Sequence, residues 1–192
     1  MKFFPILILF CVNNVFAQSL LEAREGFKTK IIKEVREAEY PLDPPKGTVS
    51  KIQYQTELGP MSAYISAKPE GNQKLPAIIW ITGGFPAGGI GEYAWEPSSK
   101  SNDQSAKVYR EKGIVMMYPS FRGADGNIGL QEGFYGEVND VLSALEYIKK
   151  LDYVDNDNIY LGGHSTGGTL ALLVAQATDE FKAVIWPSCS TD

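Results

Sequence analysis

The sequence has 192 residues, of which 44% are hydrophobic and 21% charged, a balance typical of one globular domain rather than of a disordered or fibrous chain. Its formal net charge is -5, and acidic and basic residues are interspersed along it. Because no basic block could neutralise a run of phosphates, nucleic acid is not an expected partner.

The first seventeen residues have the pattern of a secretory signal peptide. Lys2 supplies the positive charge, residues 3–12 the apolar core, and Val15-Phe16-Ala17 a small-residue cleavage site. A membrane span needs roughly 20 apolar residues, whereas Asn13-Asn14 breaks this run after about ten, so a signal is favoured over an anchor. We predict a secreted or periplasmic protein that begins at Gln18 and has no stable membrane anchor.

The two cysteines predict no intrachain disulfide. Cys11 lies inside the predicted signal, which leaves Cys189 alone in the mature chain. A small buried hydrophobic residue is the favoured interpretation of Cys189, and a reactive thiol is the alternative.

The mature chain is predicted to open with a helix over residues 20–39, which is interrupted by Gly26. Prolines at 41, 44 and 45 and the glycine at 47 then indicate a linker. We therefore expect a signal peptide at 1–17, a lead-in helix and proline-rich linker at 18–47, and one globular domain, which continues to the last residue given, at 48–192.

That domain alternates strand and helix patterns. Polar and apolar residues alternate over 48–56 and 61–66, which predicts an antiparallel hairpin. Further strands are predicted at 77–81, 114–118, 158–161 and 181–186, separated by helices at 103–112, 138–151 and 169–177. The order predicts an α/β fold with a mostly parallel sheet and helices on both faces.

One short motif carries the chemistry. Gly163-His164-Ser165-Thr166-Gly167 matches the Gly-x-Ser-x-Gly pattern and lies between a predicted strand and a predicted helix. A sharp turn there would strain the backbone and lift the hydroxyl of Ser165 above the sheet. Ser165 is thus the predicted nucleophile; the alternative is a glycine-rich turn in which Ser165 only caps the helix.

Such a nucleophile needs amide donors for the oxyanion that develops during acyl transfer. The N–H of Thr166, at the start of the predicted helix, is one candidate. The other is expected from the glycine loop after the third strand, at Gly84 or Phe85.

A general base for Ser165 is harder to find. His164 is the sole histidine, and a residue next to the nucleophile directs its side chain away from it, so His164 is expected to pack beside the turn. Arg122 and Asp140 are expected to pair with each other or to cap neighbouring elements. Asp155 and Asp157 are expected to form a turn before the fifth strand.

Several of these segments resemble the prolyl oligopeptidase-type branch of the α/β-hydrolase superfamily, over about residues 76–186. The likeness lies in residues 121–123, 137–141, 154–155 and 159–168, and the segment Trp80-Ile81-Thr82-Gly83-Gly84 is similar to one group of exported bacterial hydrolases. Thr82 stands where many members have histidine. The resemblance implies an α/β-hydrolase fold and the chain order serine, acid, histidine, with both later members beyond the sixth strand.

The resemblance also implies a function. We expect a serine hydrolase of peptidase or esterase type that cleaves an ester or amide of a small-molecule or peptide substrate through an acyl-enzyme on Ser165. The triad acid, the histidine and the C-terminal strands are expected to be missing from this chain, as in a truncated and inactive form. The alternatives are a noncatalytic secreted binding protein and a base supplied by another subunit. No cofactor or metal is expected, and the oligomeric state is open.

Overall fold

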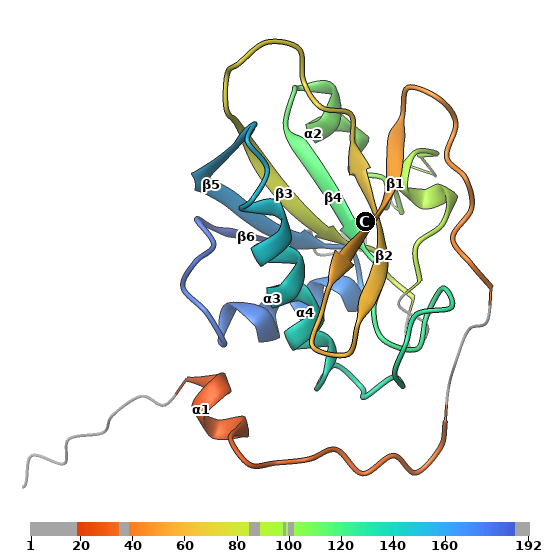
Figure 1. The fold of residues 1–192 in the computed structure, drawn as a ribbon, viewed down its shortest axis with the longest axis vertical. Coiled ribbons are helices and arrows are strands. Elements are labelled where there is room, and N and C mark those ends of the chain that lie inside the picture. Colours follow the sequence, from red (N-terminus) through yellow and green to blue (C-terminus); the bar gives the residue numbers. More distant parts are fainter. Residues whose placement is uncertain (1–18, 35–38, 85–88, 98, 100–101, 187–192) are drawn as a thin grey trace, which may run out of the picture.

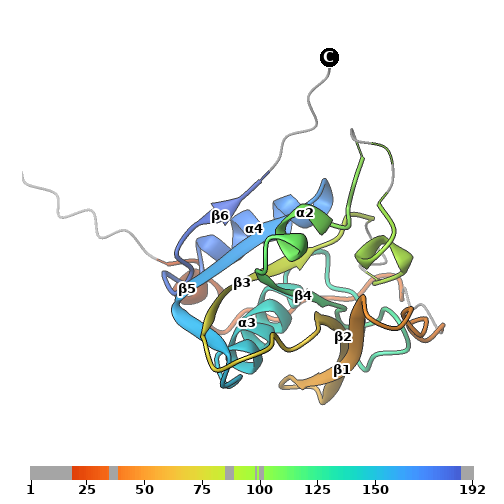
Figure 2. The same ribbon diagram turned by 90° about the horizontal axis from the view of Figure 1, so that it is seen from above.

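The computed structural model describes residues 19–34, 39–84, 89–97, 99 and 102–186. These residues form a six-stranded sheet in the order β1-β2-β4-β3-β5-β6 (Figure 1), with β1 and β6 at opposite edges (Figure 2). The strands are β1 Val49–Gln55, β2 Pro60–Ser66, β3 Leu75–Ile81, β4 Val115–Pro119, β5 Val154–Gly163 and β6 Val184–Ile185. β1, β2 and β4 pair antiparallel, and β4, β3, β5 and β6 run parallel. The predicted α/β class and hairpin are confirmed.

Helices cover both faces because successive side chains of β3 point to opposite sides of the sheet. Ile79 and Ile81 pack in a core shared with α3 (Glu137–Ile148) and α4 (Thr166–Ala175). Ile78 and Trp80 pack in a second core, against which Tyr109 of α2 (Lys107–Glu111) also lies. A continuous apolar run in β3 is therefore the signature of a strand that is buried on both sides.

The prediction of a lead-in helix over residues 20–39 is confirmed only for its first five residues and is wrong for the described residues that follow. α1 spans only Leu20–Arg24, and Gly26 follows in the left-handed conformation at φ 77°. Phe27 and Ile32, which would have formed the buried stripe, are 62% and 90% exposed, so a longer helix would bury no apolar face. Instead, the Phe27 ring lies 4.9 Å from the ring of Tyr135, and this contact holds the segment against the domain.

Other predicted elements also have different bounds. The fifth strand, predicted at 158–161, spans Val154–Gly163, so the prediction that Asp155 and Asp157 form a turn before it is wrong: both lie within the strand. The helix predicted over 103–112 begins only at Lys107, because the Asp103 carboxylate accepts hydrogen bonds from the N–H and the hydroxyl of Ser105, at 2.9 and 2.7 Å, and so forms a local turn. α4 begins three residues earlier than predicted, directly after Ser165. The sixth strand is shorter than predicted, and Val184 pairs with Leu161.

Some predictions fall outside the described residues. They include the signal peptide at 1–17, Cys11, Cys189 and Phe85. In the part of the chain that the structure does describe, we find no helix with the length and hydropathy that a membrane crossing requires.

Candidate active site

Ser165 lies at the junction of β5 and α4, directly after Gly163 and His164. Its backbone has φ 52° and ψ -120°, a conformation that residues with a side chain rarely adopt, and the residue is exposed. The strain arises because the chain must turn sharply from a buried strand into a buried helix. The turn therefore presents the hydroxyl at the surface, as a nucleophile requires.

The glycines around Ser165 are required by close backbone packing. A Cβ on Gly167 would collide with the carbonyl oxygen of Ile81 and would lie 2.7 Å from the carbonyl oxygen of Thr82. A Cβ on Gly163 would collide with Gly167 and would lie 2.8 Å from the amide nitrogen of Gly168. Since these obstacles are backbone atoms, they cannot move aside without deforming β3 or α4.

The glycine loop after β3 lies beside Ser165, at the edge where the parallel strands end. An ideal Cβ on Gly83 would lie 3.2 Å from Cβ of Ser165 and 3.1 Å from the carbonyl oxygen of His164. This placement agrees with the general rule that sites in α/β sheets form at the carboxyl ends of the strands.

The predicted oxyanion donors differ in their surroundings. Thr166 is the first residue of α4, so its N–H has no acceptor within the helix. The N–H of Gly84, in contrast, donates to the Thr166 hydroxyl at 3.0 Å, and that of Gly83 donates to Oε1 of Gln104 at 2.6 Å. Phe85, the other candidate, lies outside the described residues.

His164 packs beside the turn. Its residue is 7% exposed, and its amide N–H donates to the carbonyl oxygen of Ile81 at 2.9 Å. Within the described residues its Nδ1 has no hydrogen-bond partner, and no hydrogen bond joins its imidazole to Ser165. The structure thus brings Ser165, Thr166 and Gly84 together, and none of the residues that it describes is placed as a general base against the serine hydroxyl.

The predicted pairing of Arg122 with Asp140 is confirmed. Nε and Nη2 of Arg122 donate to the two carboxylate oxygens of Asp140 at 3.0 and 2.8 Å, and the backbone N–H of Arg122 donates to Oδ2 at 3.0 Å. Nη1 and Nη2 also reach Glu132 at 2.6 Å and Glu57 at 3.1 Å. Burial disfavours the guanidinium charge, but the hydrogen bonds and charge of Asp140 outweigh it, so the pKa of Arg122 lies above its ordinary value.

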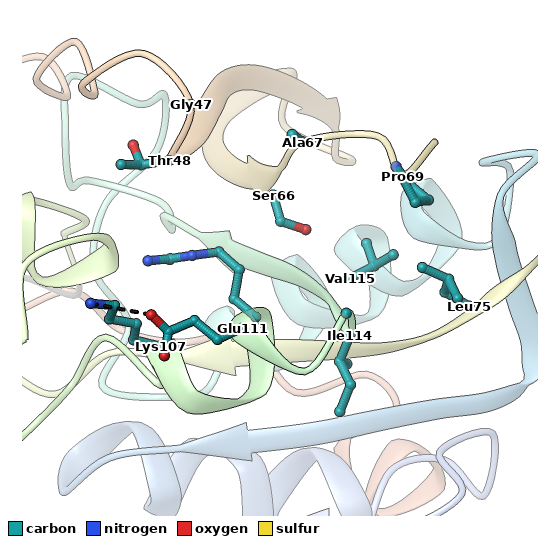
Figure 3. A pocket seen from close by; sticks show the side chains of 12 residues that line it. Gly47, Thr48, Ser66, Ala67, Pro69, Leu75, Lys107, Glu111, Ile114 and Val115 are labelled. Carbon is teal, nitrogen blue, oxygen red and sulfur yellow. Dashed lines mark ion pairs between the residues drawn. The ribbon is translucent and has the colours of Figure 1, made fainter. Parts of the chain in front are cut away.

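Among the depressions lined by described residues, two lie at opposite ends of the parallel strands. One, of about 330 Å³, is lined by Gly83 and Gly84 together with Tyr40, Tyr93 and neighbouring loops, and so adjoins Ser165. The other, of about 430 Å³, lies at the amino ends of β3 and β4 and is drawn in Figure 3. Lys107 and Glu111, which help to line it, form an ion pair with an N–O distance of 3.2 Å. Of these two, the first lies at the carboxyl ends of the parallel strands, beside Ser165, so it is the candidate substrate groove.

Gln104 is the site residue that sequence reasoning missed. It lies 21 positions from Gly83, outside any motif, and its contact is between a side chain and a backbone amide. No residue pattern signals such a contact. Among the described residues, no group of three or more histidine, cysteine or acidic residues could hold a metal ion.

Comparison with solved structures identifies the fold. The chain is similar to the α/β hydrolase GrgF from Penicillium sp. sh18 (TM-score 0.55, 21% identity, covering 72% of this chain and 45% of that one). It is also similar to a puromycin-hydrolyzing peptidase of Mycobacterium tuberculosis (TM-score 0.55, 20% identity, 74% and 23%) and to an acylaminoacyl peptidase of Pyrococcus horikoshii (TM-score 0.53, 20% identity, 72% and 22%). The chain thus spans less than half the length of each. These likenesses define an α/β-hydrolase fold.

One known family matches part of the chain. Residues 100–192, just under half of the chain, match the prolyl oligopeptidase family, whereas no curated protein matches the chain significantly. This match and the α/β-hydrolase fold agree with the resemblance seen in the sequence.

Proposed function

We propose that the protein is a serine hydrolase of peptidase or esterase type, which forms an acyl-enzyme on Ser165. The observation that carries the proposal is the exposed serine, held at φ 52° between a buried strand and the first turn of a helix. The family match of residues 100–192 and the peptidases and hydrolase among the structural neighbours support the same class of enzyme.

In the proposed reaction, Oγ of Ser165 attacks the carbonyl carbon of an ester or amide. The carbonyl oxygen becomes an oxyanion that accepts a hydrogen bond from the N–H of Thr166. Expulsion of the alcohol or amine leaves an acyl group on Ser165, and water then releases it. The groove beside Gly83 and Gly84 would receive part of the substrate.

A base must take the proton from Ser165 and deliver it to the leaving group. The 192 residues contain one histidine, and His164 forms no hydrogen bond with Ser165 in the described structure. We therefore propose that an acid and a histidine from outside these residues complete the triad, and that the 192-residue chain by itself does not turn over.

Labelling with a fluorophosphonate probe tests the proposal, because the probe reacts with an activated serine. We expect labelling of a form of the protein extended by whatever reading frame follows residue 192, and little labelling of the 192-residue chain. Ser165→Ala should abolish labelling, with a loss of at least about 10⁴-fold. Ser143→Ala is the matched control, since this serine lies on α3 and its hydroxyl donates to the carbonyl oxygen of Asn139 at 2.9 Å.

The same experiment separates the second candidate function, a secreted binding protein that retains the turn without catalysis. Two observations favour it: no base lies against Ser165 in the described residues, and the Gly84 N–H already donates to the hydroxyl of Thr166. An extended protein that folds cooperatively yet stays unlabelled would end the enzyme proposal and leave this one.

A further inference from the structure

The loop between β3 and the groove is held by two side chains from other parts of the chain. The Gly83 N–H donates to Oε1 of Gln104 at 2.6 Å, and the Gly84 N–H donates to Oγ1 of Thr166 at 3.0 Å. Gly84 has φ 102°, a conformation that favours glycine. Two consecutive amides of one loop are therefore each held by a side chain from another part of the chain, one from the segment before α2 and one from the first residue of α4.

Gln104 is itself anchored to the sheet. Its carbonyl oxygen accepts a hydrogen bond from Nε1 of Trp80 on β3 at 2.9 Å. The neighbouring Ser105 is fully buried, and its carbonyl oxygen accepts a hydrogen bond from the hydroxyl of Tyr118 on β4. Since both neighbouring strands hold this segment, the side-chain oxygen of Gln104 is presented to the loop from a rigid support.

The loop lies close to both Gln104 and the proposed nucleophile. An ideal Cβ on Gly83 would lie 3.1 Å from Oε1 of Gln104 and 3.2 Å from Cβ of Ser165. A shift of the loop would therefore change its distance to Ser165 directly. Oxyanion donors act only when they lie about 3 Å from the developing charge, so the position of this loop governs whether its amides can act.

We propose that Gln104 is a positioning residue, which holds the Gly83-Gly84 loop against Ser165 by accepting the Gly83 N–H. The proposal rests on the proposed function of Ser165. Because the Gly83 N–H donates to Gln104, it is not available to an oxyanion. Among the described residues of this site, the remaining donors are the N–H of Thr166 and the N–H of Gly84, which must first leave the Thr166 hydroxyl. Gln104 touches neither substrate nor Ser165 in this role.

The test combines two measurements on the extended form of the protein described under the proposed function. They are the hydrogen exchange of backbone amides and the rate of reaction with a fluorophosphonate probe. In ¹⁵N-glycine-labelled protein, Gln104→Met, which keeps the side-chain length but loses the acceptor oxygen, should speed exchange of the Gly83 amide at least about tenfold. Gln104→Glu keeps an acceptor oxygen and should restore protection. Gln55→Met, at the distant strand β1, is the matched control and should leave Gly83 unchanged.

The second readout is the reaction with a fluorophosphonate. Gln104→Met should lower the maximal rate of inactivation about 10- to 100-fold while the half-saturating probe concentration stays within about twofold, because donors are misplaced without loss of the groove. Far-ultraviolet circular dichroism and thermal unfolding confirm that each variant is folded.

The outcomes separate the two proposals. If the Gly83 amide of folded Gln104→Met exchanges at the wild-type rate, the positioning role is overturned, irrespective of the rate of inactivation by the probe. Faster exchange with an unchanged inactivation rate also overturns it. The third outcome has two parts: the wild-type protein does not react with the probe, and the Gly83 amide exchanges faster in Gln104→Met than in wild type. This outcome refutes the proposed function of Ser165 and supports only the contact by which Gln104 holds the loop.

Discussion

Replacing Arg122 by methionine is expected to lower the free energy of unfolding by about 3 to 5 kcal/mol. Arg122 is 3% exposed, and its partner Asp140 is fully buried at 0% exposure. Methionine fills most of the volume but leaves the Asp140 carboxylate buried without its main donor, and an uncompensated buried charge is among the costliest defects a fold can contain. Urea denaturation, followed by tryptophan fluorescence, measures the change.

Two companion variants make this prediction specific. Lys107→Met removes a pair that lies on the surface of α2, with side chains 42% and 60% exposed, and should change stability by no more than about 0.5 kcal/mol. The double variant Arg122→Met with Asp140→Leu removes both buried charges and should recover at least about half of the loss. A double variant no more stable than Arg122→Met alone would show that the pairing itself is not the source of the effect.

Gly167→Ala is expected to destabilise the protein by about 3 kcal/mol and to disturb the turn at Ser165. In an isolated helix the same change would stabilise by up to about 1 kcal/mol, because alanine is the better helix former. Here the new methyl group would run into the carbonyl oxygens of Ile81 and Thr82 at the end of β3. The steric cost outweighs the helix propensity because the obstacle is backbone, and thermal or urea unfolding shows which effect prevails.

Gly91→Ala provides the comparison for Gly167. A Cβ on Gly91 would meet only ring atoms of Tyr93, at 3.6 and 3.7 Å, which is ordinary van der Waals contact. Its backbone is extended, at φ -142°, so alanine fits without strain, and we expect a change within about 0.5 kcal/mol. Equal stability of Gly167→Ala and Gly91→Ala would refute the close packing of α4 on β3.

Much of the fold and of the proposed site could be predicted from local sequence. The alternating hairpin and the apolar runs of β3 and β4 depend on side-chain periodicity, which is set by burial on one or both faces of a sheet. The turn at Ser165 could be located because the Gly-x-Ser-x-Gly pattern stands between a strand pattern and a helix pattern, although Gly167 is required by contacts with the distant residues Ile81 and Thr82. The pairing of Arg122, which lies before the glycine-rich loop, with Asp140, on the predicted helix, could be anticipated only as one of two options.

Local sequence patterns were enough to predict the succession of strands and helices, the serine at the sharp turn between two of them, and the family to which residues 100–192 are similar. The folded structure was needed to see that the first helix ends at Arg24, that Gln104 accepts the amide of Gly83, and that the Thr166 hydroxyl accepts the amide of Gly84. The difference lies in the sequence separation of the contacts involved. Periodicity and turn chemistry act between near neighbours in the chain, whereas these three features depend on contacts between residues 21 to 111 positions apart, which exist only once the sheet has assembled.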